Sequence, residues 1–81
     1  MNLVKLVDVY FEESYKYYIT YEPNSISDAE FDGICKVLYD NFNSIPTNYR
    51  EILDKDSLSA GTGFSITREH YKKANKLRDE K

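Results

Sequence analysis

Apolar side chains recur every three or four positions along the first part of the chain, and this spacing gathers them on one face of a helix. The positions in this stripe, which includes one serine, are Leu3, Leu6, Val7, Tyr10, Ser14, Tyr17, Tyr18 and Tyr21. The charged positions between them mix both signs, as is typical of a solvated surface, and are Lys5, Asp8, Glu12, Glu13 and Lys16. We therefore predict a first helix over about residues 3–19, with these charges on its outer face.

A short polar segment interrupts this pattern at residues 22–25. Its Pro23 cannot continue a helix and disfavours the α-helical conformation in the residue before it. Ser27 and Glu30 then have the spacing of a capping box, in which each side chain satisfies a backbone N–H at a helix start. We predict a second helix over about residues 27–42, whose apolar face holds Ile34, Cys35, Leu38 and Phe42. The apolar stripes of the two helices can pack together as a helical hairpin.

The periodicity becomes weaker beyond Asn43. Thr47 can cap a short third helix that runs through about Asp54. The apolar contacts of this helix are Tyr49, Ile52 and Leu53. The segment after it contains the run Ser-Leu-Ser-Ala-Gly-Thr-Gly, and this composition predicts a flexible loop over residues 57–66.

The last segment begins with a second cap candidate, Thr67, and has most of its basic residues toward its end, which suits the helix dipole. Its apolar set is small and consists of Ile66, Tyr71, Ala74 and Leu77. We therefore predict a C-terminal helix over residues 67–81 that docks loosely. Together these elements predict an all-α fold in a single domain over residues 1–81.

Composition and charge narrow the class of protein. With 41% hydrophobic and 15% aromatic residues, the 81-residue chain can build a core. Fourteen acidic and eleven basic residues give a net charge of −3, so we expect no direct binding of nucleic acid. The single cysteine, Cys35, lies within an apolar stripe, and no run approaches the ~20 apolar residues of a membrane span. We expect a cytoplasmic protein that does not bind membranes.

Catalytic and metal-binding sets are not evident. The single His70 falls on a charged terminal helix, where a surface position is expected, and one histidine with one cysteine cannot complete a tetrahedral zinc site. The run Gly61-Thr62-Gly63 lacks the longer pattern of a phosphate-binding loop and reads as a turn. We expect no catalytic residues, no metal and no enzymatic activity.

Aromatic rings and carboxylates gather on either side of the predicted turn. Tyr17 and Tyr18 end the first helix, and Asp28 and Asp32 are four residues apart on the first turns of the second. Aromatic faces stack on a planar or cationic ring, and carboxylates accept hydrogen bonds from ribose hydroxyls or oppose a positive charge. A purely structural interpretation is also open, because tyrosines bury well and an aspartate at a helix start is stabilising by itself.

The order of these residues matches a known family. The chain reads Tyr15-Lys16-Tyr17-Tyr18-Ile19, then Pro23, then Ile26-Ser27-Asp28-Ala29-Glu30-Phe31-Asp32. This succession resembles the N-terminal helical domain of bacterial NAD-dependent DNA ligases, where a Tyr-Tyr or Tyr-His pair precedes Pro-x-Ile-Ser-Asp-Ala-Glu-Tyr-Asp. The resemblance covers about residues 10–42.

In that family the domain holds the nicotinamide mononucleotide (NMN) half of NAD. The resemblance therefore implies NMN or NAD as the ligand, with Tyr17 and Tyr18 contacting the ring. It implies Asp28 and Asp32 as polar contacts. Phe31 stands where the family has a tyrosine and supplies one hydroxyl fewer.

The ligases adenylate a lysine in a Lys-x-Asp-Gly motif, which this chain lacks; its nearest string, residues 30–33, has glutamate at the lysine's place. We therefore expect a non-catalytic module that binds a nicotinamide nucleotide or acts on a ligase-related protein partner. The alternative is a small phage-type interaction protein that binds and modulates a host protein, with no nucleotide ligand. A third hypothesis is an adenylation subunit completed in trans.

Overall fold

The computed structural model describes residues 2–63 and 66–79, and helices are the regular elements of this part of the chain. The α-helices are α1 (Leu3–Tyr15), α2 (Asp28–Asp40), α3 (Thr47–Arg50), α4 (Lys55–Ser59) and α5 (Arg68–Asp79). A π-helical turn, η1 (Lys16–Thr20), and a 3-10 turn, η2 (Phe42–Ser44), complete the set. The predicted all-α class is confirmed. None of these helices combines the length and apolarity that crossing a bilayer requires.

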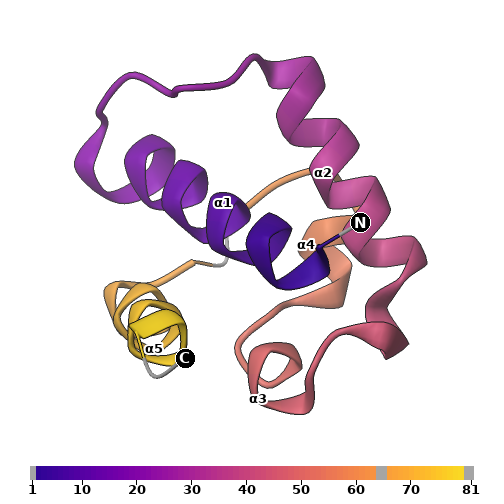
Figure 1. The fold of residues 1–81 in the computed structure, drawn as a ribbon. Coiled ribbons are helices and arrows are strands. Elements are labelled where there is room, and N and C mark those ends of the chain that lie inside the picture. The colour runs from indigo at the N-terminus through magenta and orange to yellow at the C-terminus, as the bar shows by residue number, and fades with distance from the viewer. Residues whose placement is uncertain (1, 64–65, 80–81) are drawn as a thin grey trace.

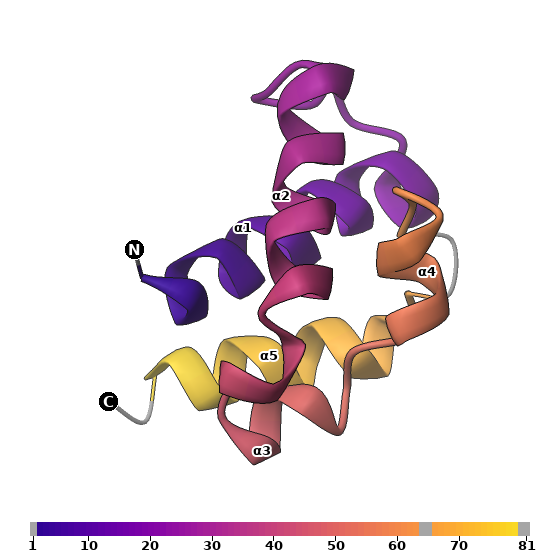
Figure 2. The ribbon, with the colours of Figure 1, turned by 90° about the vertical axis from the view of Figure 1, so that its right-hand side faces the viewer.

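Helix α1 lies in the middle of the fold, with α2 on one side and α5 on the other (Figure 1). After the turn at residues 21–27, α2 runs back across α1, and α4 packs against α2 (Figures 1 and 2). The predicted helical hairpin is therefore present. The apolar core draws on all five α-helices and on the segments between them, and its members are Val7, Tyr10, Phe11, Cys35, Leu38, Ile45, Tyr49, Ile52, Leu58, Ile66 and Ala74.

The first predicted helix corresponds to α1 and η1 together. The Asn2 side chain caps its start by accepting a hydrogen bond from the Lys5 N–H at 3.1 Å. Its end is marked by Tyr21, which adopts the left-handed conformation with φ 59° and ψ 29°. Turns of the π type are uncommon and recur at functional sites. Here the π turn carries both Tyr17 and Tyr18.

The capping box at the start of α2 is confirmed. Ser27 Oγ accepts from the Glu30 N–H at 3.1 Å, and Glu30 Oε1 accepts from the Ser27 N–H at 3.4 Å. Cys35 and Leu38 are fully buried, as their place in the apolar stripe predicts. The helix ends at Asp40, two residues earlier than expected, and a 3-10 turn follows.

The third predicted helix is shorter than expected, because α3 ends at Arg50 and not near Asp54. Thr47 does not cap it: Pro46 holds the cap position, and Thr47 Oγ1 accepts from Arg50 Nη2 at 2.9 Å. Asp54 instead caps α4, since its carboxylate accepts from the Asp56 N–H at 3.2 Å and from Ser57 Oγ at 2.7 Å.

The loop prediction for residues 57–66 is wrong at its start, because Ser57 and Leu58 lie within α4 and are buried. The small polar residues of this run resemble a loop in composition, but the Asp54 cap and the burial of Leu58 stabilise a helical turn. Residues 64 and 65 of the predicted loop lie outside the described residues.

The C-terminal helix begins as predicted, with Thr67 Oγ1 accepting from the His70 N–H at 3.1 Å. It is anchored more closely than its small apolar set predicts. Ala74 is buried, and the Tyr71 ring stacks on the Tyr15 ring of α1 at a centroid distance of 3.9 Å. Residues 80 and 81 of the predicted helix lie outside the described part of the chain.

Candidate functional site

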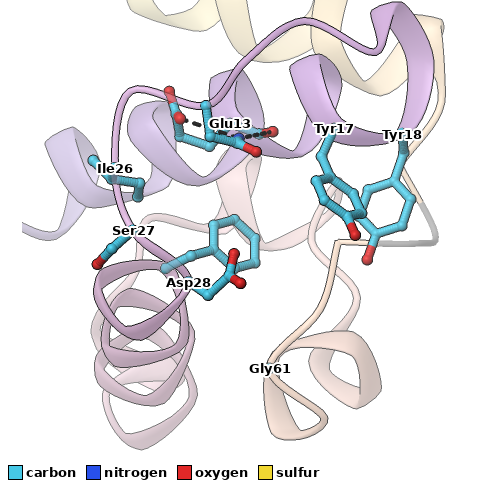
Figure 3. Close-up of a pocket in the computed structure, with 9 residues that line it drawn as sticks. Glu13, Tyr17, Tyr18, Ile26, Ser27, Asp28 and Gly61 are labelled. Atoms are coloured by element: carbon cyan, nitrogen blue, oxygen red, sulfur yellow. Dashed lines mark hydrogen bonds between the residues drawn. The ribbon is translucent and has the colours of Figure 1, made fainter.

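A cavity of ≈ 200 Å³ lies where η1, the turn at residues 21–27, the start of α2 and Gly61 come together (Figure 3). Tyr17 and Tyr18 form one wall, and Asp28 and Phe31 of α2 form another. In Figure 3 the two tyrosine rings and the Asp28 side chain lie on either side of the gap above Gly61. The π turn and the capped start of α2 therefore bring together rings and a carboxylate that are ten or more positions apart in the chain.

Four of the five residues predicted for the site line this cavity: Tyr17, Tyr18, Asp28 and Phe31. Asp32 does not line it. The Asp32 carboxylate lies beside the cavity against Gly61, so close that a methyl group on Gly61 would collide with Asp32 Oδ1. Gly61 also has φ +70°, a conformation that favours glycine. Asp32 is thus at the edge of the site.

The two tyrosines differ in how they are held. Their rings meet edge to face, with centroids 4.8 Å apart and planes at 68°. Tyr18 is half-buried, and its hydroxyl hydrogen-bonds Thr62 Oγ1 at 2.6 Å. Tyr17 is 57% exposed. Tyr18 is therefore a fixed wall, whereas the Tyr17 ring is available to a ligand.

Thr62 joins this wall to the core, because its backbone carbonyl accepts from the Tyr10 hydroxyl at 3.0 Å. Burial, with smaller contributions from the charges of Cys35 and Asp54, raises the pKa of Tyr10 far above its usual value. Tyr10 is therefore a neutral donor at physiological pH. Its ring also stacks on Phe31, at a centroid distance of 5.6 Å, so Phe31 links the cavity to the core.

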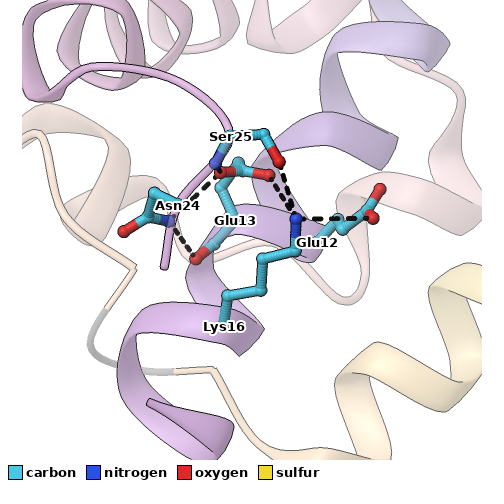
Figure 4. Close-up of polar contacts among 5 residues, drawn as sticks. All are labelled: Glu12, Glu13, Lys16, Asn24 and Ser25. Carbon is cyan, nitrogen blue, oxygen red and sulfur yellow. Dashed lines mark hydrogen bonds and ion pairs between the residues drawn. The ribbon is translucent and has the colours of Figure 1, made fainter. Parts of the chain in front are cut away.

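Glu13 lines the cavity, and its position differs from the one predicted from the sequence. It was expected on the solvated outer face of the first helix, but only 3% of it is exposed, because the turn folds over it (Figure 4). Glu13 Oε1 accepts from the Ser25 N–H at 2.7 Å and from Asn24 Nδ2 at 3.2 Å, and Glu13 Oε2 pairs with Lys16 Nζ at 3.4 Å. Its partners in the turn are 11 and 12 positions away, so no local spacing signals this contact.

The ionisation of Glu13 follows from these contacts. Burial raises its pKa, but the hydrogen bonds from the Ser25 N–H and Asn24, together with the Lys16 charge, outweigh that effect and hold the pKa below its usual value of 4.5. Glu13 is therefore ionised at neutral pH, and its oxygens are engaged by the turn. It shapes the cavity and is not free to bind a ligand.

The groups that line the cavity can stack on a ring and can form hydrogen bonds with a ligand. They offer aromatic faces, an exposed carboxylate on Asp28 and amide and hydroxyl groups from the turn. His70 lies away from the cavity on α5. Among residues 2–63 and 66–79, no group of three or more His, Cys, Asp and Glu side chains could hold a metal ion.

Cys35 gives a check on the packing behind the site. Its side chain is fully buried, and burial, with a smaller effect of the Asp32 charge, raises the pKa of the thiol to about 12. We expect the native protein to react with iodoacetamide at neutral pH at least about 100-fold more slowly than the urea-unfolded chain, because the thiol is both inaccessible and protonated. Labelling followed by mass spectrometry measures this ratio. Equal rates would contradict the packing of α2 against α1.

Comparisons with protein-family models, with curated proteins and with solved structures yield no match to this chain. The likeness to the ligase domain therefore remains a prediction that rests on the motif residues.

Proposed function

We propose that this chain is a small, non-catalytic cytoplasmic module that binds the nicotinamide part of NMN or NAD in the cavity between η1 and α2. One observation carries the proposal: an exposed tyrosine ring and an exposed carboxylate face the same cavity, at positions of a motif that resembles the ligase NMN-binding domain. Enzymatic activity, membrane contact and direct nucleic-acid binding are not part of this function.

In the proposed complex the nicotinamide ring stacks on Tyr17, and Tyr18 closes the side of the site. Asp28 accepts hydrogen bonds from the ribose hydroxyls or opposes the cationic ring, with Asp32 contributing from the edge. The cavity volume of ≈ 200 Å³ is below the roughly 300–1,000 Å³ of typical ligand pockets. It suits a single ring with part of its sugar, so the adenylate half of NAD lies in solvent.

Tyr17→Ala is expected to weaken NMN binding by roughly tenfold, because a ring that stacks on a cation contributes about 1–2 kcal/mol. Its stability should change little, since Tyr17 is 57% exposed. Isothermal titration and NMR shift mapping with NMN and NAD measure the effect. Tyr39→Ala is the matched control, because Tyr39 is also an exposed tyrosine, 39% accessible, and lies outside this cavity. No heat and no shift changes at millimolar NMN or NAD would falsify the nucleotide-binding proposal.

A second candidate function is that of a phage-type interaction protein that binds and modulates a host protein, such as a ligase-related enzyme, without a nucleotide. It is favoured by Tyr21, which is 83% exposed and directly follows the π turn that carries Tyr17. Exposed tyrosines are frequent anchors at interfaces. A pull-down from bacterial lysate tests this function. It is supported if a protein partner is recovered with the unaltered chain and with Asp28→Asn, with or without NMN, but not with Tyr21→Ala. The third hypothesis, an adenylation subunit completed in trans, is tested by mixing this chain with a ligase that lacks its own N-terminal domain.

A further inference from the structure

The charged residues that line the cavity are acidic. Among the described residues that line it, Glu13 and Asp28 are acidic, and none is Lys, Arg or His. The Asp32 carboxylate lies directly behind Gly61 at its edge. Neither Asp28 nor Asp32 takes part in the ion pairs found in the described part of the chain. These two aspartates therefore have no ion-pair partner in the described part of the chain.

Lys16, the basic residue of η1, does not change this balance. Its ammonium group faces three oxygens: Ser25 Oγ at 2.8 Å, Glu13 Oε2 at 3.4 Å and Glu12 Oε1 at 3.9 Å (Figure 4). Two of its three N–H donors are hydrogen-bonded, to Ser25 Oγ and Glu13 Oε2, and the contact with Glu12 is an ion pair. Lys16 therefore neutralises the buried Glu13, and it is not among the described residues that line the cavity.

Two backbone N–H groups at the start of α2 are engaged by the capping box. An anion at such a position normally accepts from free backbone N–H groups. Here the Glu30 N–H donates to Ser27 Oγ and the Ser27 N–H donates to Glu30 Oε1. The carboxylate of Asp28 stands at the first helical position and adds a repulsive charge.

We propose that this cavity selects a cationic nucleoside, nicotinamide riboside, over its 5′-phosphate, NMN. This inference rests on the proposed function, because it names the form of the ligand that the same site prefers. The pyridinium ring carries one positive charge, which the aromatic faces and the two aspartates attract. The phosphate of NMN carries about −1.5 to −2 charges at neutral pH, which the same aspartates repel and which no cation at the cavity offsets.

The test compares the dissociation constants of nicotinamide riboside and NMN by isothermal titration at low ionic strength. We expect the riboside to bind about fivefold to tenfold more tightly, and the ratio to fall as added salt screens the aspartates. Asp28→Asn should reduce the ratio to about twofold or less, because it removes the nearer charge. Asp40→Asn is the matched control: it changes the net charge equally but lies at the far end of α2, about 18 Å away along the helix. In Asp40→Asn the ratio of the two dissociation constants should equal that of the unaltered protein.

The outcomes separate this inference from the function on which it rests. If NMN binds as tightly as the riboside or more tightly, selection by charge is wrong while the nicotinamide site stands. The inference is also overturned if the ratio of the two dissociation constants is the same in Asp28→Asn as in Asp40→Asn. If neither compound binds at millimolar concentration, both proposals fall.

Discussion

Gly63→Ala is expected to lower the free energy of unfolding by about 1–3 kcal/mol, the range typical of overpacking a closed interior. Gly63 is buried against Ser14 of α1, which is itself fully buried. A methyl group on Gly63 would lie 2.6 Å from Ser14 Cβ and would also collide with its hydroxyl oxygen. Because Ser14 Cβ is bonded directly to the backbone of α1, it cannot move aside without separating α1 from the segment that carries Thr62. Urea denaturation followed by circular dichroism measures the change.

Gly33→Ala is the matched control for this experiment. Gly33 lies within α2, and a methyl group there would meet nothing within 4 Å. Since alanine favours a helix interior by up to about 1 kcal/mol over glycine, this variant should be more stable than the unaltered protein. The double variant Ser14→Gly with Gly63→Ala should recover part of the loss, because it removes the colliding atoms. Equal destabilisation in Gly33→Ala and Gly63→Ala would mean that the contact between Gly63 and Ser14 is not what limits stability.

Glu13→Ala is expected to cost about 2–3 kcal/mol of stability and to abolish ligand binding. The substitution removes the acceptor of the Ser25 N–H and the partner of Lys16 at 3.4 Å. It also removes one of the two acceptors of Asn24 Nδ2, which keeps its hydrogen bond to the Glu13 backbone carbonyl at 3.0 Å. Hydrogen bonds to a charged group contribute about 1.5–3 kcal/mol, and donors left without an acceptor add to the loss. The turn would then be held less firmly against α1, and the part of the cavity wall that Asn24 supplies would lose its fixed position.

Glu12→Ala is the control for Glu13→Ala. Glu12 precedes Glu13 in the chain and also pairs with Lys16, at 3.9 Å, but the Glu12 side chain is 51% exposed. An exposed pair of this kind contributes about 0–1 kcal/mol. We therefore expect Glu12→Ala to lose at most about 1 kcal/mol of stability. If Glu13→Ala loses no more stability than Glu12→Ala, the buried network is contradicted.

The same network predicts a dependence of stability on pH. The pKa of Glu13 is lower in the folded chain than its usual value of 4.5, so its contribution is complete above that pH. The contribution is lost as the pH falls below 4.5 through the folded value. The difference in stability between the unaltered protein and Glu13→Ala should therefore shrink at low pH. Urea titrations at pH 7 and at several acidic pH values measure that difference.

Much of the fold follows from patterns within a few residues. The stripe that contains Tyr10, the capping box at Ser27 and Glu30, and the cap at Thr67 all depend on contacts three or four positions apart. The grouping of Tyr17, Tyr18, Asp28 and Phe31 was also predictable, because a helix, a short turn and a capped second helix leave little freedom in how the two ends meet. By contrast, the α4 turn was missed because its composition resembles a loop.

The two long N-terminal helices, the caps at Ser27 and Thr67 and most of the site residues can be predicted from the sequence, since these depend on local spacing and backbone preference. The burial of Glu13, its pairing with Lys16 and the contact of Asp32 with Gly61 depend instead on tertiary packing. The hydrogen bonds that hold Thr62 against α1 and η1 join residues 52 and 44 positions apart. Contacts across such separations depend on how whole helices pack, and this packing sets the shape and charge of the cavity.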